Sequence, residues 1–324
     1  MEASLQSCLS LRSSLFPQQT NAYRVVHRKE LPGYDIAFDR YGDWGCLWVY
    51  EEIPYGNDSI TRYQGIISFI QKELSLKGVV VKAPQRNPHN NRLVDFQTTV
   101  GEAPPAHFTV YEDDLFYNVT LTESQHIGLF LDQRDNRKKV KEKAYGKRVL
   151  NLFSYTCSFS VAAASANCEV VFSVDVAGPC LQIGKDNFET NSLAEKQVGK
   201  FIKEDVRTWL KKQLRKKDKG NLVPFDIIVC DPPVFAKSKK EGNFSVEKEW
   251  DFLADACSQV LSDDGFAFFS NNHRKGVDKK YFQELRKYFK HVEPISPSLD
   301  FPELEHLKGY EKHVRMYFCK KPIR

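Results

Sequence analysis

The sequence lacks the cysteine and histidine patterns of a metal site or a disulfide framework. Its eight cysteines stand at least eleven residues apart, no Cys-x-x-Cys occurs, and no two histidines have the spacing of paired ligands. A zinc site is therefore not expected. Scattered thiols are typical of a reducing compartment, so we expect a cytoplasmic protein that binds no metal.

Long apolar runs are also absent. No run approaches the length of a membrane span, and the first fifteen residues have neither the basic start nor the apolar core of a signal peptide. We therefore expect no membrane partner. With 324 residues, of which 41% are hydrophobic and 27% charged, the composition is that of a globular protein with two domains, or one domain and an added module.

The net charge is small, but it is unevenly distributed. Residues 1–124 carry 11 basic and 15 acidic side chains, whereas residues 125–324 carry 36 basic and 27 acidic ones. A concentration of positive charge in one part of a chain indicates a polyanionic partner or a solvated lysine-rich surface. Charge by itself does not decide between these two.

The pattern of apolar residues changes near position 125. Residues 1–124 contain two candidate hairpins and an amphipathic helix, which predicts a small α+β domain. In residues 125–324 apolar strands alternate with helices, which predicts an α/β domain with a Rossmann-like parallel sheet covered on both faces. Ligands of such sheets bind at the carboxyl ends of the strands. The expected strands are 149–153, 169–174, 198–202, 225–230 and 265–270, with a late pair near 291–296 and 315–319.

The loop after the first strand of this sheet contains no glycine. It runs from Asn151 through Leu-Phe-Ser-Tyr-Thr-Cys to Ser158 and leads into an alanine-rich helix. A dinucleotide site would require Gly-x-Gly-x-x-Gly at this turn, so the loop argues against NAD or FAD. Adenosylmethionine has no phosphate and makes a weaker demand on the backbone. The helix N-terminus still offers free N–H donors.

Acidic residues follow the second and third strands. Asp175 stands where an acidic side chain can bind both hydroxyl groups of a ribose, although capping of the next helix is an equally good interpretation. Asp205 could accept a hydrogen bond from an adenine amino group.

The strongest motif follows the fourth strand and reads Asp231-Pro-Pro-Val-Phe235. An apolar strand delivers Asp231 to the edge of the sheet, and Pro232 and Pro233 then fix the backbone. A rigid platform suits a transfer reaction that depends on alignment. Phe235 could present its ring to a planar base.

Two further segments carry polar side chains that fit a ligand. The fifth strand leads into Ser270-Asn271-Asn272-His-Arg274, whose amides and arginine could bind a base or a phosphate. No cysteine stands there for attack on a pyrimidine, and Cys230 lies inside an apolar strand, where we interpret it as a core residue. Before the sheet, Asp132 and Arg134 carry the charges that would complement the amine and carboxylate of a methionine group.

Together these motifs resemble the class I adenosylmethionine-dependent methyltransferases of bacterial large-subunit ribosomal RNA, and among them the guanine-N7 (RlmK) group. The cytosine-C5 (RlmI-type) enzymes are more distant. The resemblance extends over nearly the whole chain. It is carried by residues 22–25, 31–34, 39–44, 128–134, 151–156, 231–235 with Ser238 and Lys239, and 270–274.

The resemblance implies a site for S-adenosyl-L-methionine and a large-subunit rRNA substrate. Asp132 and Arg134 would bind the amino-acid end of the cofactor, Asp175 the ribose and Asp205 the adenine. The loop would contribute Asn151, Phe153, Ser154, Tyr155, Thr156, Cys157 and Ser158. Asp231 and Pro232 would lie beside the sulfonium, with Pro233 as part of the same rigid platform, and Phe235 would stack on the base. Asn271 and Asn272 would read the guanine edge, and phosphates would meet Lys237, Lys239, Lys240, Arg274 and Lys275.

Three other functions remain open at this point. One is a cytosine-C5 rRNA methyltransferase that uses a cysteine whose role is not evident from the sequence. Another is an RNA-binding module of the same fold with weak or lost catalysis, suggested by Cys157, where the family generally has glycine. A nucleotide-dependent oxidoreductase is the third, and the glycine-free turn disfavours it.

Overall fold

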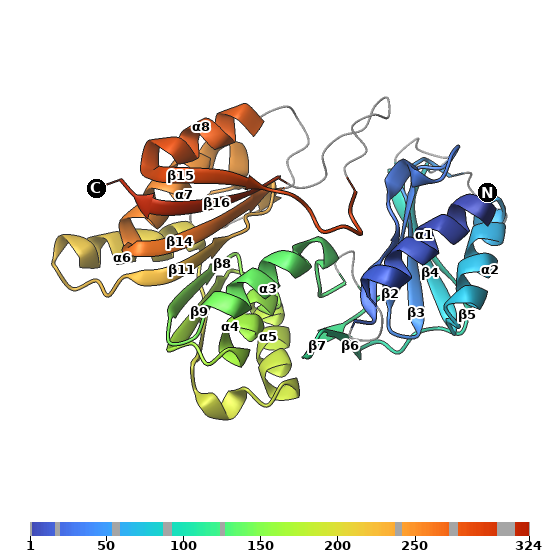
Figure 1. Ribbon diagram of the computed structural model, residues 1–324, viewed down its shortest axis with the longest axis horizontal. Helices are drawn as coiled ribbons and strands as arrows, with labels where there is room; N and C mark the ends of the chain where they lie inside the picture. Colours follow the sequence, from blue (N-terminus) through green and yellow to red (C-terminus); the bar gives the residue numbers. More distant parts are fainter. Residues whose placement is uncertain are drawn as a thin grey trace. The chain divides into compact units, whose positions relative to one another are not determined.

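The structure is a computed structural model that describes residues 2–16, 20–53, 59–86, 93–123, 127–236, 242–271, 278–302 and 315–323 (Figure 1). Its contacts divide the chain into two compact units. One comprises Met1–Asp132 with Ser298–Tyr310, and the other comprises Gln133–Pro297 with Glu311–Arg324. The sequence placed the division at 124/125. The contacts place it eight residues later, and Ile127 is linked back to the end of β7 by a hydrogen bond from Thr120 N to Ile127 O at 2.9 Å.

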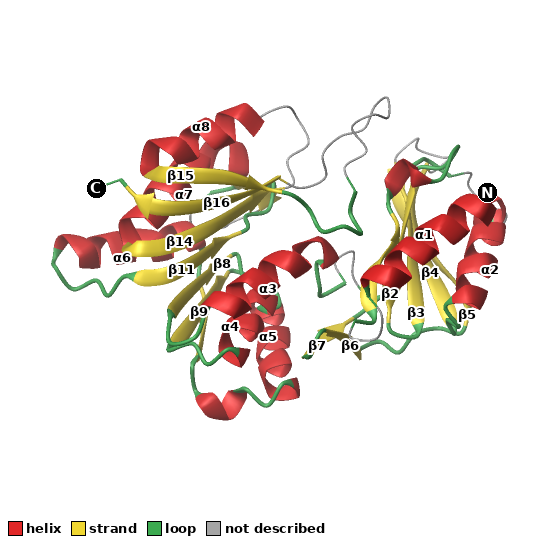
Figure 2. Ribbon diagram, in the orientation of Figure 1, coloured by secondary structure: helices red, strands yellow, loops and turns green. Residues whose placement is uncertain are grey.

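The N-terminal unit contains a five-stranded sheet in the order β1-β2-β3-β4-β5. Neighbouring strands are antiparallel except β3 and β4, which are parallel and are joined by a helical crossover. Figure 2 shows α1 and α2 on the same face of this sheet. The elements are α1 (Glu2–Leu15), β1 (Ala22–Val26), β2 (Ile36–Tyr41), β3 (Trp44–Val49), α2 (Gln64–Glu73), β4 (Gly78–Arg86) and β5 (Leu93–Gly101), with a separate hairpin of β6 (Phe108–Glu112) and β7 (Leu115–Val119).

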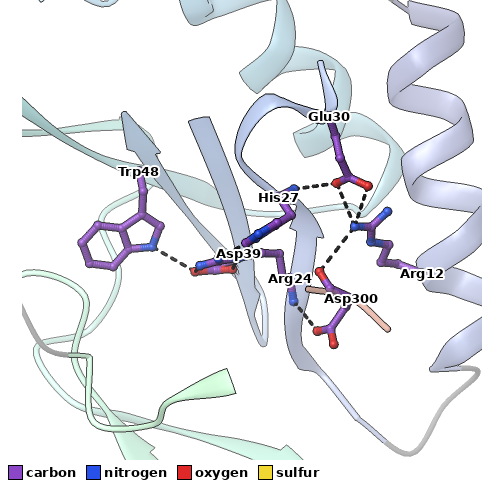
Figure 3. Close-up of polar contacts among 7 residues, drawn as sticks. All are labelled: Arg12, Arg24, His27, Glu30, Asp39, Trp48 and Asp300. Atoms are coloured by element: carbon purple, nitrogen blue, oxygen red, sulfur yellow. Dashed lines mark hydrogen bonds and ion pairs between the residues drawn. The ribbon is translucent and has the colours of Figure 1, made fainter. Parts of the chain in front are cut away.

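A buried ion pair joins two of the sequence motifs in this unit (Figure 3). Arg24 from the motif at 22–25 donates through Nε and Nη2 to the carboxylate of Asp39 from the motif at 39–44, at 2.7 and 3.0 Å. Trp48 Nε1 donates to the same carboxylate at 2.9 Å. Burial by itself lowers the pKa of Arg24, but the charge and hydrogen bonds of Asp39 outweigh it and raise the pKa. These motifs therefore hold β1, β2 and β3 together.

The segment that begins at Ser298 packs against the Arg24–Asp39 ion pair. Asp300 accepts a hydrogen bond from Arg24 N at 3.0 Å through its side chain and one from Arg12 Nη2 at 3.4 Å through its carbonyl. The ring of Phe301 lies 4.3 Å from the Arg24 guanidinium. Because Asp300 is fully buried, this part of the chain belongs structurally to the N-terminal unit although it follows most of the second unit in sequence.

The second unit contains a seven-stranded sheet in the order β10-β9-β8-β11-β14-β16-β15. The first five strands in this order are parallel, and β16 is antiparallel to both of its neighbours. Helices cover both faces, with α3, α4 and α5 on one and α6, α7 and α8 on the other (Figures 1 and 2). The predicted Rossmann-like α/β fold is confirmed. The strands are β8 (Arg148–Leu152), β9 (Val170–Asp175), β10 (Gly199–Lys203), β11 (Phe225–Cys230), β14 (Leu261–Asn271), β15 (Phe289–Ile295) and β16 (Arg315–Pro322).

The helices return the chain to the start of each parallel strand, so the loops after β8, β9, β10, β11 and β14 share one edge of the sheet. Strand order reverses between β8 and β11, which is where ligands bind in open α/β sheets. The helices are α3 (Arg134–Lys143), α4 (Ser158–Ser165), α5 (Gly178–Thr190), α6 (Val206–Asp218), α7 (Val246–Val260) and α8 (Asp278–Tyr288).

Candidate active site

The loop between β8 and α4 adopts a glycine-like backbone without containing glycine. Phe153, Tyr155 and Cys157 have left-handed φ angles of 55°, 48° and 61°. Each costs a non-glycine residue about 1–2 kcal/mol. Hydrogen bonds hold the loop in place: Ser154 N donates to Val174 O at 3.1 Å and Cys157 N donates to Ser154 O at 2.8 Å. The loop thus obtains a sharp turn at the cost of local strain.

The side chain of Cys157 fills a space that Gly184 of α5 leaves open. A Cβ atom at position 184 would lie 2.5 Å from Cys157 Sγ and 2.9 Å from its Cβ. Cys157 is fully buried, and burial raises the pKa of its thiol to about 12. Asn187 of the same helix donates to Thr156 O at 2.9 Å. Helix α5 therefore supports the loop at two adjacent positions.

We expect Gly184→Ala to destabilise the second unit by about 1–3 kcal/mol, the usual cost of overpacking. Glycine to alanine inside a helix ordinarily stabilises by roughly 1 kcal/mol. The sign of the change in unfolding free energy therefore shows whether the Cβ atom meets Cys157. Hydrogen exchange of the β8 and β9 amides, which belong to the second unit, measures the effect. The double variant Gly184→Ala/Cys157→Gly should recover most of the loss, whereas a more stable Gly184→Ala protein would contradict the packing argument.

The polar side chains of Asn151, Ser154 and Thr156 in this loop are buried. Asn151 on β8 donates to Ser160 Oγ at 2.9 Å, and Ser160 in turn lies 2.8 Å from Ser173 Oγ. The Asn151 amide thus connects β8 to α4, and it is 2% exposed. Ser154 and Thr156 are 6% and 1% exposed, and Ser158 is the first residue of α4. The loop would therefore meet a ligand mainly through its backbone and the N-terminus of α4.

Asp175 ends β9 and accepts two backbone hydrogen bonds. Tyr155 N donates to Oδ2 at 2.9 Å and Ala177 N donates to Oδ1 at 2.8 Å. Burial raises the pKa of Asp175, and the backbone donors counteract part of that increase. A carboxylate offers about four acceptor positions, so a ribose hydroxyl can still bind. The turn and this carboxylate fit the nucleoside part of S-adenosyl-L-methionine.

If Asp175 binds the ribose as predicted, its raised pKa should make cofactor affinity depend on pH. As the pH falls through that pKa the carboxylate is protonated and loses acceptor capacity, so the affinity should fall about 10-fold or more, given 1.5–3 kcal/mol for a hydrogen bond to a charged group. Folded-state protonation is favoured here, so this group does not destabilise the fold at low pH. Calorimetry with S-adenosylhomocysteine from neutral to mildly acidic pH measures the effect. Asp175→Asn should bind weakly with a flat profile, and a pH-independent wild type would contradict the assignment.

The carboxylate of Asp205 already forms contacts within the protein. Its side chain accepts from Arg207 N at 2.9 Å as the N-cap of α6, and it forms an ion pair with the Arg207 guanidinium at 2.9 Å. Arg207 also donates to Glu249 Oε1 at 3.0 Å and to Gly242 O at 2.9 Å. A contact between Asp205 and an adenine amino group stays a prediction. It would use an acceptor position beside Arg207.

Asp231 directly follows β11, and its carboxylate meets two partners from other elements. Ser270 Oγ donates to Oδ1, and Gln133 Nε2 lies 3.4 Å from Oδ2. Strand register explains the first contact, because Cys230 of β11 pairs with Phe269 of β14. Pro232 is buried and Pro233 exposed. The motif thus places the Asp231 carboxylate at the edge of the sheet, where Ser270 and Gln133 hold it in position.

Phe235 follows on a short hairpin and presents its ring to solvent. β12 (Phe235–Ala236) pairs with β13 (Phe244–Ser245), and the Phe235 side chain is 54% exposed. Phe244 on the opposite strand packs against Phe153 of the cofactor loop, with ring centroids 5.2 Å apart. The hairpin is therefore packed directly on the loop that would hold the cofactor.

The structure describes some of the remaining predicted site residues, and the others lie outside the described part of the chain. Asn271 ends β14, opposite Arg315 of β16, and is 1% exposed. Arg134 begins α3 and is 4% exposed, whereas Asp132 belongs by its contacts to the N-terminal unit. The predicted residues outside the described part of the chain are Asn272, Lys237, Lys239, Lys240, Arg274 and Lys275.

None of the eight cysteines, all of which lie in described segments, has the environment of an activated thiol. Seven are buried, and Cys180 is partly exposed. Burial raises the pKa of Cys230 well above its usual value, with further contributions from Cys257 and Asp231. Burial, and secondly the charge of Asp175, also raises the pKa of Cys180. A nucleophilic cysteine instead needs a lowered pKa and access to its substrate.

Sequence reasoning gave no role to four residues that shape this site: Gln133, Gly184, Arg207 and Ser270. An isolated glycine inside a helical pattern and a serine at the end of a strand were visible, but their partners are distant in sequence. In the described segments no group of three or more His, Cys, Asp or Glu side chains could hold a metal ion. No helix found there is both long and apolar enough to cross a bilayer.

The fold and the site define a class of protein, and comparison with known families agrees. The profile of the S-adenosylmethionine-dependent methyltransferases matches residues 91–279. The chain belongs to this family, and its cofactor is S-adenosyl-L-methionine. A solved structure of SMU.776, assigned as a methyltransferase and complexed with SAH, has 26% sequence identity and a TM-score of 0.78, covering 99% of this chain and 80% of that one.

Among curated relatives, similarity points to enzymes that act on ribosomal RNA. Ribosomal RNA large subunit methyltransferase K/L of Dichelobacter nodosus is 33% identical over 82% of this chain and 35% of its own length. Ribosomal RNA large subunit methyltransferase K of Neisseria meningitidis is 32% identical over 79% of this chain and 70% of its own length. The chain thus spans about a third of the K/L proteins and most of the separate K protein.

Proposed function

We propose that this protein transfers a methyl group from S-adenosyl-L-methionine to N7 of a guanine in large-subunit ribosomal RNA. The family, the names of the K and K/L relatives and the basic balance of residues 125–324 support the RNA substrate. The eight free cysteines support a reducing compartment, so we place the reaction in the cytoplasm.

The reaction needs no base. When bound, the cofactor supplies a sulfonium whose S–CH₃ bond breaks as the lone pair of guanine N7 forms the N7–CH₃ bond. The products are a neutral thioether and a guanine that carries the positive charge, and no proton moves. The task of the protein is to align the base, exclude water and stabilise this displaced charge.

Asp231 is suited to stabilise that charge. Its carboxylate is held at the sheet edge by Ser270 and Gln133. Because the positive charge moves from sulfur to the imidazole ring of guanine, a fixed anion beside the acceptor stabilises the transition state more than the neutral base. Pro232 and Pro233 restrict the backbone on which this carboxylate stands.

The observation that carries the choice of N7 over cytosine C5 is the state of the thiols. Attack on C6 of cytosine requires a thiolate next to the base, but Cys230, the cysteine nearest in sequence to Asp231, is fully buried in β11, and this burial also raises its pKa. N7 of guanine has an in-plane lone pair and needs no nucleophilic residue. Gly184 accommodates the Cys157 side chain, so Cys157 gives little support to an inert RNA-binding module.

Phe235 is proposed to stack on the target base once that base has left its helix. Stacking on an aromatic side chain contributes about 1–3 kcal/mol per base, so Phe235→Ala should reduce RNA methylation about 10- to 100-fold. Binding of S-adenosylhomocysteine should be unchanged, because the ring is exposed. Tyr145→Ala, which removes an exposed ring (78%) between α3 and β8, before the start of the strand and so at the opposite edge of the sheet, is the matched control. Full activity in Phe235→Ala would remove this role.

The two units are proposed to divide the work. Residues 133–297 with 311–324 would hold the cofactor and carry out the transfer. The N-terminal unit, which begins with the net acidic residues 1–124, would position the RNA through shape and a few local contacts. The charges of Arg24 and Asp39 in its sheet are buried and paired with each other, so they are not available to phosphates.

The decisive experiment uses large-subunit rRNA that lacks the modification. The purified protein and labelled cofactor are incubated with this RNA, which is then digested and analysed by mass spectrometry. We expect 7-methylguanosine at one mapped position. 5-Methylcytidine would identify the cytosine-C5 alternative, and cofactor binding without any methylated RNA would exclude ribosomal RNA as the substrate.

A further inference from the structure

A chain of buried amide and hydroxyl groups leads to the carboxylate of Asp231. Asn136 of α3 donates through Nδ2 to Gln133 Oε1 at 2.8 Å, and Gln133 Nε2 lies 3.1 Å from Ser270 Oγ and 3.4 Å from Asp231 Oδ2. Ser270 Oγ also contacts Asp231 Oδ1. Gln133, Asn136 and Ser270 are only 4%, 3% and 6% exposed. Water therefore has little access to the groups that contact Asp231 from this side.

The carboxylate of Asp231, at the end of this series of hydrogen bonds, determines which group donates in each of them. An ionised carboxylate only accepts hydrogen bonds, so Gln133 must turn its NH₂ group toward Asp231 and Ser270. Its Oε1 then faces Asn136, which must turn its own NH₂ group toward it. Because Ser270 Oγ accepts from Gln133, its proton is directed to Asp231 Oδ1. A single arrangement thus satisfies Gln133, Ser270 and the carboxylate together.

We propose that Ser270 and Gln133 are positioning residues for methyl transfer, which fix the orientation of the Asp231 carboxylate toward the reacting base. The inference rests on the proposed role of Asp231 in the transfer. The carboxylate is one bond rotation from other orientations, and the two donors engage both of its oxygens. A group displaced by about 1 Å can lower a rate by 10²-fold, so orientation matters as much as charge.

The test compares Ser270→Ala with wild type in single turnovers at saturating cofactor and RNA. Total transfer of labelled methyl is measured, so the result does not depend on which base is modified. We expect the rate constant to fall about 10- to 100-fold. The affinity for S-adenosylhomocysteine should stay within threefold, because Ser270 acts through Asp231. Ser270→Thr, which keeps the hydroxyl, should restore the rate to within about threefold of wild type.

Ser258→Ala is the matched control, since Ser258 is also buried and its hydrogen bond to a described residue lies within α7, to Asp255 O at 2.7 Å. An unchanged rate in Ser270→Ala overturns the proposal. So does a loss that Ser258→Ala shares, or one that Ser270→Thr does not reverse. A loss of cofactor affinity would assign Ser270 to the cofactor site instead.

A crystal structure of Ser270→Ala with S-adenosylhomocysteine separates this inference from the proposed function. We expect the Asp231 carboxylate to rotate away from its wild-type orientation, whether or not the wild-type protein methylates ribosomal RNA. An Asp231 side chain that keeps its orientation would overturn the positioning role. Absence of methyl transfer by the wild type would instead refute the proposed substrate.

Discussion

Asp231→Asn is expected to lower the rate of methyl transfer by about 10²–10³-fold, the range found when one preorganised electrostatic contact is removed from a transition state. The amide has nearly the shape of the carboxylate but no charge. It also turns an NH₂ group toward Gln133 Nε2 or Ser270 Oγ, both of which need an acceptor. Charge stabilisation and orientation are thus lost together.

Single-turnover methylation of unmodified large-subunit rRNA measures this effect. The matched control is Asp226→Asn at the other end of the same strand, where the carboxylate accepts from Arg148 N at 2.9 Å. Because Asp226 lies at the opposite edge of the sheet, this variant should transfer methyl at the wild-type rate. A wild-type rate in Asp231→Asn would show that the Asp-Pro-Pro motif serves structure alone.

Asp39→Ala has the largest expected effect on stability. Asp39 is 2% exposed and accepts from both Arg24 and Trp48 (Figure 3). Its removal leaves the Arg24 guanidinium charged and buried, which costs about 3–5 kcal/mol when one partner of a buried pair is lost. Unfolding of a protein with two units need not be two-state, so hydrogen exchange of the β1 and β2 amides is the appropriate measurement.

A second ion pair in the same unit provides the comparison. Arg28 and Asp35 lie 2.7 Å apart, but their side chains are 21% and 24% exposed. Asp35→Ala should therefore cost at most about 1 kcal/mol. Replacing both charges of the buried pair, in Arg24→Met/Asp39→Leu, should recover much of the loss. Equal protection of the β1 and β2 amides in Asp39→Ala and Asp35→Ala would contradict this account.

Most elements of the second unit were predictable because their apolar residues follow a local period. The strand 225–230 coincides with β11, and the strands at 149–153 and 169–174 differ from β8 and β9 by one residue at each end. Strand β5 was not predicted, because polar residues such as Asp95, Gln97 and Thr98 leave it without the apolar run that marked the other strands. Its pairing with β4 along nine residues decides its structure.

The positions of Asp175, Asp205 and Asp231 followed from one rule, that the loops after parallel strands meet at one edge. The sequence could not show what each carboxylate contacts. Asp205 is bound to Arg207, two residues away, because both lie at the start of α6. Asp231 meets Ser270 and Gln133, which are 39 and 98 residues away and come from different elements.

The amino-acid sequence by itself determined the class of fold, the segments of the chain that form the site-bearing strands and the absence of a glycine-rich nucleotide loop. Each of these depends on residues close together in the chain. Only the tertiary structure decided that Gly184 makes room for Cys157, that Asp300 joins the N-terminal unit and that a buried chain of donors orients Asp231. These contacts depend on how elements pack, and local periodicity does not encode which distant side chains then meet.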